Sequence, residues 1–165
     1  LAAVGVETFI RVGTTGALQS DIEIGDTVVA TGAAKDEGTT KRHESATIPA
    51  VADHDVLSAL IDAAKGREAP VHVGPIATDD AFYAETPEHV DAWSEAGLLC
   101  VEMEAAALFT LARRKGLAAG AICTVDGNLV EGTQKGETED DELPEKALDN
   151  VARAIRIALD AATRL

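Results

Sequence analysis

Residues 98–127, LLCVEMEAAALFTLARRKGLAAGAICTVDG, decide the fold class of this chain. The segment opens with a short apolar run, continues into an Ala- and Leu-rich stretch that ends in Arg113, Arg114 and Lys115, and returns to an apolar run after Gly116. Ala and Leu favour a helix, and cations in a last turn followed by glycine are typical of a helix end. The segment therefore predicts a strand, a helix and a second strand.

The same alternation continues on both sides of this segment. Short apolar runs bounded by turn residues indicate strands at 7–13, 25–33 and 71–80. Helical patterns cover 53–66, 87–97 and 143–165, the last with an apolar stripe at Leu148, Val151, Ile155 and Leu159. The alternation predicts one α/β domain over residues 1–165, a three-layer α/β/α fold with a mixed central sheet and its chemistry at strand ends.

Two polar stretches, residues 35–47 and 126–142, lack apolar periodicity and are predicted to be mobile loops. Between Asp126 and Asn150 there are nine acidic and two basic side chains. We interpret this segment as a solvated acidic loop, with a substrate gate as the alternative.

The composition excludes several classes of partner. The 165 residues carry 14 basic and 29 acidic side chains, a formal charge of −15, which opposes binding to nucleic acid and to anionic membranes. There is no apolar stretch of membrane-spanning length and no basic signal-peptide region, so we expect a cytoplasmic protein. Strong acidity with few lysines and aromatics resembles proteins of salt-loving organisms, which predicts a halophilic protein.

An anion-binding motif follows the first predicted strand. RVGTTGALQ (residues 11–19) places Thr14, Thr15 and Gly16 directly after the strand that carries Arg11. Glycine lets a ligand approach the backbone, the hydroxyls donate hydrogen bonds, and a guanidinium pairs with an oxyanion through two parallel bonds. The motif indicates a phosphate or carboxylate site, with a plain turn bearing a surface ion pair as the alternative.

In VEMEAAAL the predicted strand runs directly into the predicted helix, with Glu102 and Glu104 on either side of Met103. Alternation along an extended backbone places the two carboxylates on one side and Met103 on the other. Carboxylates at the end of an apolar strand need donors, and sugar hydroxyls suit them. In the alternative, Glu104 favours a helix N-terminus and Glu102 pairs with a structural arginine.

Adjacent aromatic residues, Phe82 and Tyr83, follow another predicted strand in a chain with only five aromatic side chains. Phe82 is suited to stack on a planar base, and core packing is its alternative. Cys100 and Cys123 each lie in an apolar run, and the four histidines share no spacing, so we expect buried reduced thiols and no metal site.

These motifs, in this order and at these distances, resemble the hexameric nucleoside phosphorylases, in the branch that contains uridine phosphorylase and the bacterial-type purine nucleoside phosphorylase. RVGTTGALQ is similar to the phosphate loop of that family, and VEMEAAAL to its most specific signature. The resemblance implies reversible phosphorolysis, in which nucleoside and phosphate give free base and ribose 1-phosphate with no metal or organic cofactor. It also implies a homo-oligomer in which dimers assemble into a hexamer.

The resemblance also implies roles for individual residues, with Arg11 and Glu104 as the catalytic pair. The implied contacts are Arg11 and Thr14 to phosphate, Met103 and Glu104 to ribose, and Thr15, Gly16, Phe82 and Glu102 to the base.

The motifs do not agree on which base the protein binds. In the purine branch an aspartate that protonates the base follows the strand after one serine; here Asp126 comes one place early and Gly127 stands in its position, unless a bulge restores it. The Gln and Arg that the uridine branch carries after its aromatic pair are absent, yet RVGTTGALQ with Gln19 is closer to the uridine enzymes. We expect a uridine phosphorylase, with a purine nucleoside phosphorylase as the alternative.

Other classes of protein stay open. Nucleosidases that act on methylthioadenosine and S-adenosylhomocysteine share the fold and the E-M-E signature, but they use water and need no arginine at position 11. The family carries a further phosphate motif upstream of the region matching Leu1, so we expect these residues to lack the N-terminal third of a phosphorylase. A nucleoside-binding module is the non-catalytic alternative, and an unrelated α/β domain with chance motifs is the last.

Overall fold

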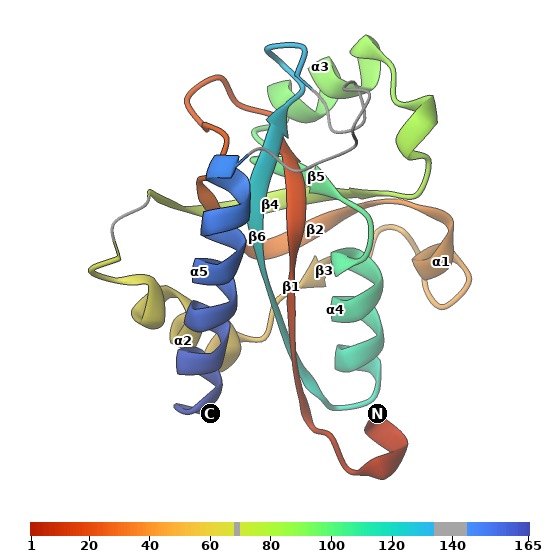
Figure 1. Cartoon of the computed structure of the whole chain (residues 1–165). Coiled ribbons are helices and arrows are strands. Elements are labelled where there is room, and N and C mark those ends of the chain that lie inside the picture. Colours follow the sequence, from red (N-terminus) through yellow and green to blue (C-terminus); the bar gives the residue numbers. More distant parts are fainter. Residues whose placement is uncertain (68–69, 134–144) are drawn as a thin grey trace.

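The computed structural model describes residues 1–67, 70–133 and 145–165, and shows a mixed sheet with helices on both sides (Figure 1). The predicted α/β/α fold is therefore confirmed. The strands are β1 (Thr8–Ala17), β2 (Thr27–Asp36), β3 (Ala50–Val51), β4 (Val71–Asp79), β5 (Cys100–Glu102) and β6 (Ala118–Asn128). The helices are α1 (Gly38–Lys41), α2 (His54–Ala64), α3 (Pro87–Glu95), α4 (Ala105–Arg114) and α5 (Glu145–Ala162), with 3₁₀ turns η1 (Ala2–Val4) and η2 (Phe82–Ala84).

The sheet closes on itself through β6 and β2, with the two-residue strand β3 outside the circuit. The strand order is β3-β2-β4-β5-β1-β6, and β6 pairs in addition with the start of β2. Strand β1 runs parallel to β6 along its whole length but meets β5 only at Gly16 and Ala17. This closed circuit, which the sequence did not predict, brings the carboxyl ends of β1 and β6 together beside β5.

Each face of the sheet is covered by helices. On one face Phe109 of α4 is fully buried in a cluster that includes Val28 of β2. On the other, Leu60 of α2 and Ile157 of α5 pack in a cluster that includes the next residue of β2, Val29. A strand buried on both faces explains why these runs are apolar throughout rather than alternating.

The predicted helix limits agree with the structure. The Asp53 side chain accepts hydrogen bonds from the backbone N–H of Asp55 at 3.0 Å and of Val56 at 3.2 Å, so it caps α2 at the predicted start of the helix. Pro87 occupies the first turn of α3, and Gly97 beyond its end has a φ of 75°. These ends are set by local residues.

The prediction that an apolar stripe forms the buried face of the last helix is wrong. The large side chains of Leu148, Ile155 and Leu159 are exposed. Small side chains let α5 lie close to α2 and to the sheet, and dense packing outweighs the greater hydrophobicity of leucine. The buried face consists of Ala147, Asn150, Ala154, Ile157, Ala158 and Ala161.

The polar stretch 35–47 is anchored rather than free. The side chain of Glu44 is only 3% exposed and pairs with Lys35 and with Arg113 of α4, the latter at 2.5 Å. Glu37 caps α1 by accepting from the backbone N–H of Thr40. In the other predicted loop, residues 126–128 belong to β6 and Thr133 bridges back to Asn128, while 134–142 lie outside the described residues.

The two cysteines are free and buried, as predicted. Across the part of the chain that the structure describes, no helix is long and apolar enough to cross a membrane, and no cluster of three or more His, Cys, Asp or Glu is arranged to hold a metal ion.

Glu44→Gln is expected to destabilise the fold at neutral pH. The hydrogen bond from Lys35 lowers the pKa of the Glu44 carboxyl, Arg113 lowers it further, and burial opposes both. Because the pKa is lower in the folded state, the ionised Glu44 stabilises the fold at a pH above its unfolded-state pKa, and this stabilisation is lost as the pH falls. The difference in stability between wild type and Glu44→Gln should therefore narrow below about pH 4. Urea unfolding midpoints at pH 7 and pH 3.5 measure this. The control is Asp62→Asn, which removes an exposed pair with Lys65; an unchanged Glu44→Gln midpoint at pH 7 would contradict the expectation.

Candidate active site

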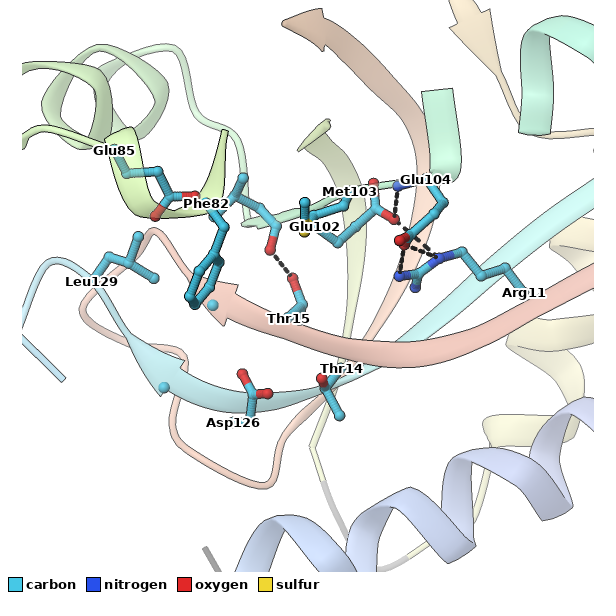
Figure 2. A pocket seen from close by; sticks show the side chains of 13 residues that line it. Arg11, Thr14, Thr15, Phe82, Glu85, Glu102, Met103, Glu104, Asp126 and Leu129 are labelled. Carbon is cyan, nitrogen blue, oxygen red and sulfur yellow. Dashed lines mark hydrogen bonds and ion pairs between the residues drawn. The ribbon is translucent and has the colours of Figure 1, made fainter. Parts of the chain in front are cut away.

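A cavity of about 210 Å³ opens where β1, β5 and β6 end beside η2 (Figure 2). Segments far apart in the sequence supply its walls. All the residues predicted for the site line it, namely Arg11, Thr14, Thr15, Gly16, Phe82, Glu102, Met103 and Glu104. The structure therefore brings the three motifs to one place.

The guanidinium of Arg11 lies between two carboxylates and a sulfur atom. Its Nε is 3.1 Å from Oε2 of Glu102 and donates to Oε2 of Glu104 at 3.0 Å, and Nη2 also pairs with Glu104. Its Nη1 lies 3.1 Å from Sγ of Cys123. Arg11 thus has a fixed position in the cavity wall, with its charge balanced by acidic partners.

Glu102 is the buried member of the acidic pair, with a side chain only 1% exposed. Its carboxylate accepts from Oγ1 of Thr78 at 2.6 Å and from the backbone N–H groups of Glu104 and Ala105 at 2.9 and 3.0 Å. It therefore stabilises the start of α4 as well as Arg11. The pairing with Arg11 matches the alternative given for Glu102, but the helix start is bound by Glu102 and not by the side chain of Glu104. The contact of Glu102 with a base stays a prediction.

Glu104 and Met103 face outward. The Glu104 side chain is 61% exposed and Met103 is exposed as well, so both are accessible to a ligand in the cavity (Figure 2). Both carboxylates bind Arg11, as expected for a pair on one side, but Met103, which was predicted on the other side, lines the same cavity. Of the two, Glu104 is the one accessible to sugar hydroxyls.

The two threonines of the phosphate motif differ in their surroundings. The hydroxyl of Thr15 is buried and donates to the carbonyl oxygen of Val101 at 2.6 Å, which ties β1 to β5. Thr14 lies on the cavity wall near Asp126 (Figure 2). Thr14 is thus the threonine of this motif available to an anion.

A β-bulge places Asp126 in the cavity. Thr15 is paired with Val125 and Gly16 with Gly127, so Asp126 is the extra residue of β6. It is 8% exposed and lines the cavity with Gly127. The bulge considered in the sequence analysis is therefore present, although the sequence alone could not place it.

Phe82 and Glu85 form the far end of the cavity from Arg11 (Figure 2). Phe82 is partly buried and makes an edge-to-face contact with the exposed residue Tyr83, at a distance of 5.1 Å between the ring centroids. Sequence reasoning missed Glu85 as a site residue; the available signal was its position just after the aromatic pair.

The cavity is strongly acidic. Among the described residues that line it, Arg11 is the only Arg or Lys, against Glu85, Glu102, Glu104 and Asp126. Burial lowers the pKa of Arg11, but the interactions with Cys123, Glu102 and Glu104 raise it by more than burial lowers it. The net shift of the pKa is upward, and Arg11 keeps its charge. Burial raises the pKa of Cys123 to about 12, which leaves a neutral thiol against the guanidinium at pH 7.

An α/β fold that gathers an arginine, paired glutamates and an aromatic ring around one cavity defines an enzyme-like small-molecule site. The model of the phosphorylase superfamily matches residues 1–164. The chain belongs to this family.

Its relatives include purine and uridine enzymes. The chain is 66% identical, over its whole length, to a guanosine phosphorylase of Halorubrum lacusprofundi, of which it covers 68%. It is 43% identical to a uridine phosphorylase of Thermococcus kodakarensis, with 84% of this chain and 56% of that protein aligned. It is 38% identical to a DeoD-type purine nucleoside phosphorylase of Pectobacterium atrosepticum, with 89% and 64% aligned.

A solved structure has the same fold. The Plasmodium knowlesi homologue of Plasmodium falciparum PNP superposes with a TM-score of 0.82 at 26% identity, over 98% of this chain and 65% of that one. The chain thus spans between half and about two thirds of the length of these relatives.

Gly13→Ala is expected to displace Arg11 without unfolding the protein. A Cβ at Gly13 would lie 2.3 Å from Nη1 of Arg11, so the flexible end of the arginine must move. If Arg11 binds phosphate, as the sequence predicts, the loss of one charge-assisted hydrogen bond should weaken phosphate binding about tenfold. Calorimetric titration with phosphate, beside a thermal unfolding curve, measures both effects, with Arg11→Ala as the reference for complete loss. Wild-type phosphate affinity in a folded Gly13→Ala protein would contradict the predicted role of Arg11 in phosphate binding.

Proposed function

We propose that the protein is a purine nucleoside phosphorylase that transfers the ribosyl group of a 6-oxopurine nucleoside to phosphate. The observation that carries the proposal is the bulge that brings Asp126 into the cavity containing Arg11 and Glu104. Similarity to the Halorubrum guanosine phosphorylase over the whole chain supports it. We also propose that the protein forms the homo-oligomer that the family resemblance implies, in which dimers assemble into a hexamer.

The structure gives little support to Gln19 as a sign of uridine specificity. The side-chain amide of Gln19 donates to the backbone carbonyls of Ser94 at 3.1 Å and Leu98 at 2.8 Å, so it is used in packing β1 against the segment before β5. The described lining of the cavity contains no glutamine, and its arginine is held by Glu102 and Glu104. Uridine stays as the alternative substrate, supported by the identity to the Thermococcus enzyme.

The proposed reaction assigns each end of the cavity to one part of the substrate. Arg11 and Thr14 bind phosphate, Glu104 accepts hydrogen bonds from the ribose 2′ and 3′ hydroxyls, and Met103 packs on the sugar. A bound phosphate dianion stabilises the positive charge that develops on the ribose as the glycosidic bond breaks. Phe82 stacks on the departing base.

Asp126 serves the leaving group. A phosphate oxygen bonds to C1′ while the bond from C1′ to N9 breaks. The electron pair of the broken bond passes to the purine ring. Asp126 delivers a proton to N7, so the base leaves neutral. Overall, hydrogen phosphate loses its proton and gains the ribosyl group, and the base gains one proton, so the step balances without a redox partner.

The test is phosphate consumption with guanosine, inosine, adenosine and uridine. The proposal expects phosphate-dependent release of ribose 1-phosphate from guanosine and inosine. Turnover of uridine alone would overturn the purine assignment. Free ribose formed without phosphate would indicate a nucleosidase, and nucleoside binding without turnover would indicate a binding module.

Asp126→Asn is expected to lower kcat for guanosine by about 100-fold, because general acid catalysis is lost. KM should change little, since the asparagine retains the shape of the site. Asp149→Asn, an exposed change on α5, is the control. Wild-type kcat in Asp126→Asn would remove Asp126 from the mechanism.

Glu104→Gln is expected to bind phosphate several-fold more tightly than wild type when no nucleoside is present. The Glu104 carboxylate competes with phosphate for Arg11, and the neutral amide competes less. Calorimetric titration measures it. Glu85→Gln removes a charge at the far end of the same cavity and controls for the general field. Equal or weaker phosphate binding in Glu104→Gln would show that the ion pair does not oppose the anion.

A further inference from the structure

We propose that Glu85 binds the Watson–Crick edge of guanine and makes the protein selective for guanosine among purine nucleosides. The inference rests on the proposed purine phosphorolysis and names a residue that selects the base.

Glu85 lies at the end of the cavity that the proposed function gives to the base. It directly follows η2, the turn that carries Phe82, and it is partly exposed. Its carboxylate lies beside Phe82, near Leu129 and away from Arg11 (Figure 2). A base stacked on Phe82, with its ribose at Glu104, presents its outer edge toward this end.

Among the described residues, the polar side chains at the base end of the cavity carry mainly acceptor oxygens. Asp126 enters from β6 and Glu85 from η2, on different sides of Phe82 (Figure 2). The hydroxyl proton of Thr15 is already donated to Val101. Such a site favours a base with several N–H donors and disfavours one whose edge presents carbonyl oxygens or ring lone pairs.

Guanine has the edge that fits a carboxylate. Its N1–H and 2-amino groups are adjacent donors, which match the two oxygens of a carboxylate in a bidentate pair. Hypoxanthine offers the N1–H alone, and adenine places an N1 lone pair against the carboxylate. With Asp126 at N7, Glu85 can bind the N1 and C2 edge on the other ring of the same base, and the expected order of affinity is guanosine, inosine, adenosine.

The experiment is calorimetric binding of these three nucleosides to wild type, Glu85→Gln and Glu85→Ala without phosphate. Wild type should bind guanosine about tenfold more tightly than inosine, because one charge-assisted hydrogen bond is gained. The ratio should fall to about threefold in Glu85→Gln and to about one in Glu85→Ala, since the amide retains one acceptor. Glu88→Gln, exposed on α3 three residues further on, should keep the wild-type ratio. Because Glu85 is partly exposed, both variants are expected to fold, and thermal unfolding checks this.

The outcomes separate this inference from the proposed function. If guanosine does not bind, or if its advantage over inosine persists in both Glu85 variants, the role of Glu85 is overturned. Ribose 1-phosphate release is measured on the same samples. Guanosine selectivity that depends on Glu85 without any turnover would support the inference and overturn phosphorolysis, whereas turnover with an unchanged ratio would overturn the inference alone.

Discussion

The buried carboxylate of Glu102 joins several elements at the functional end of the molecule. It accepts from Thr78 at the end of β4 and from the first N–H groups of α4, and it pairs with Arg11 of β1. An ionised group without water is costly unless its oxygens are satisfied by donors, so these partners must stay in place together. Glu102 is thus a positioning residue, through which the start of α4 and the position of Arg11 depend on each other.

The remaining parts of the site follow from the way the sheet closes. Because β6 pairs along the whole of β1 while β5 pairs with the end of β1, residues of these three strands line one cavity, and a single extra residue in β6 changes which side chain points into it. The bulge supplies Asp126, and the short connection after β4 supplies Phe82 and Glu85. The proposed division into a phosphate end and a base end follows the separation of Arg11 from Glu85.

The elements set by local residues were predictable from the sequence. Asp53 caps α2, Pro87 begins α3, and VEMEAAAL joins a strand to a helix as expected. The bulge at Asp126 was not, because it depends on the register between β1 and β6, which are about 100 residues apart in the chain. The expectation of uridine rested in part on Gln19, whose amide forms backbone hydrogen bonds that no short motif reveals. The buried face of α5 was missed because packing density, rather than side-chain hydrophobicity, selects its alanines.

The most direct test of this account follows the Arg11 side chain during a phosphate titration. Arginine Nε–H resonances of the protein labelled with nitrogen-15, assigned with Arg11→Lys, report the exchange of Glu104 for phosphate at the guanidinium. The account predicts a saturable shift of the Arg11 Nε–H signal, with the remaining arginine signals unmoved. An Arg11 signal that stays in place while phosphate is consumed in the reaction would contradict it.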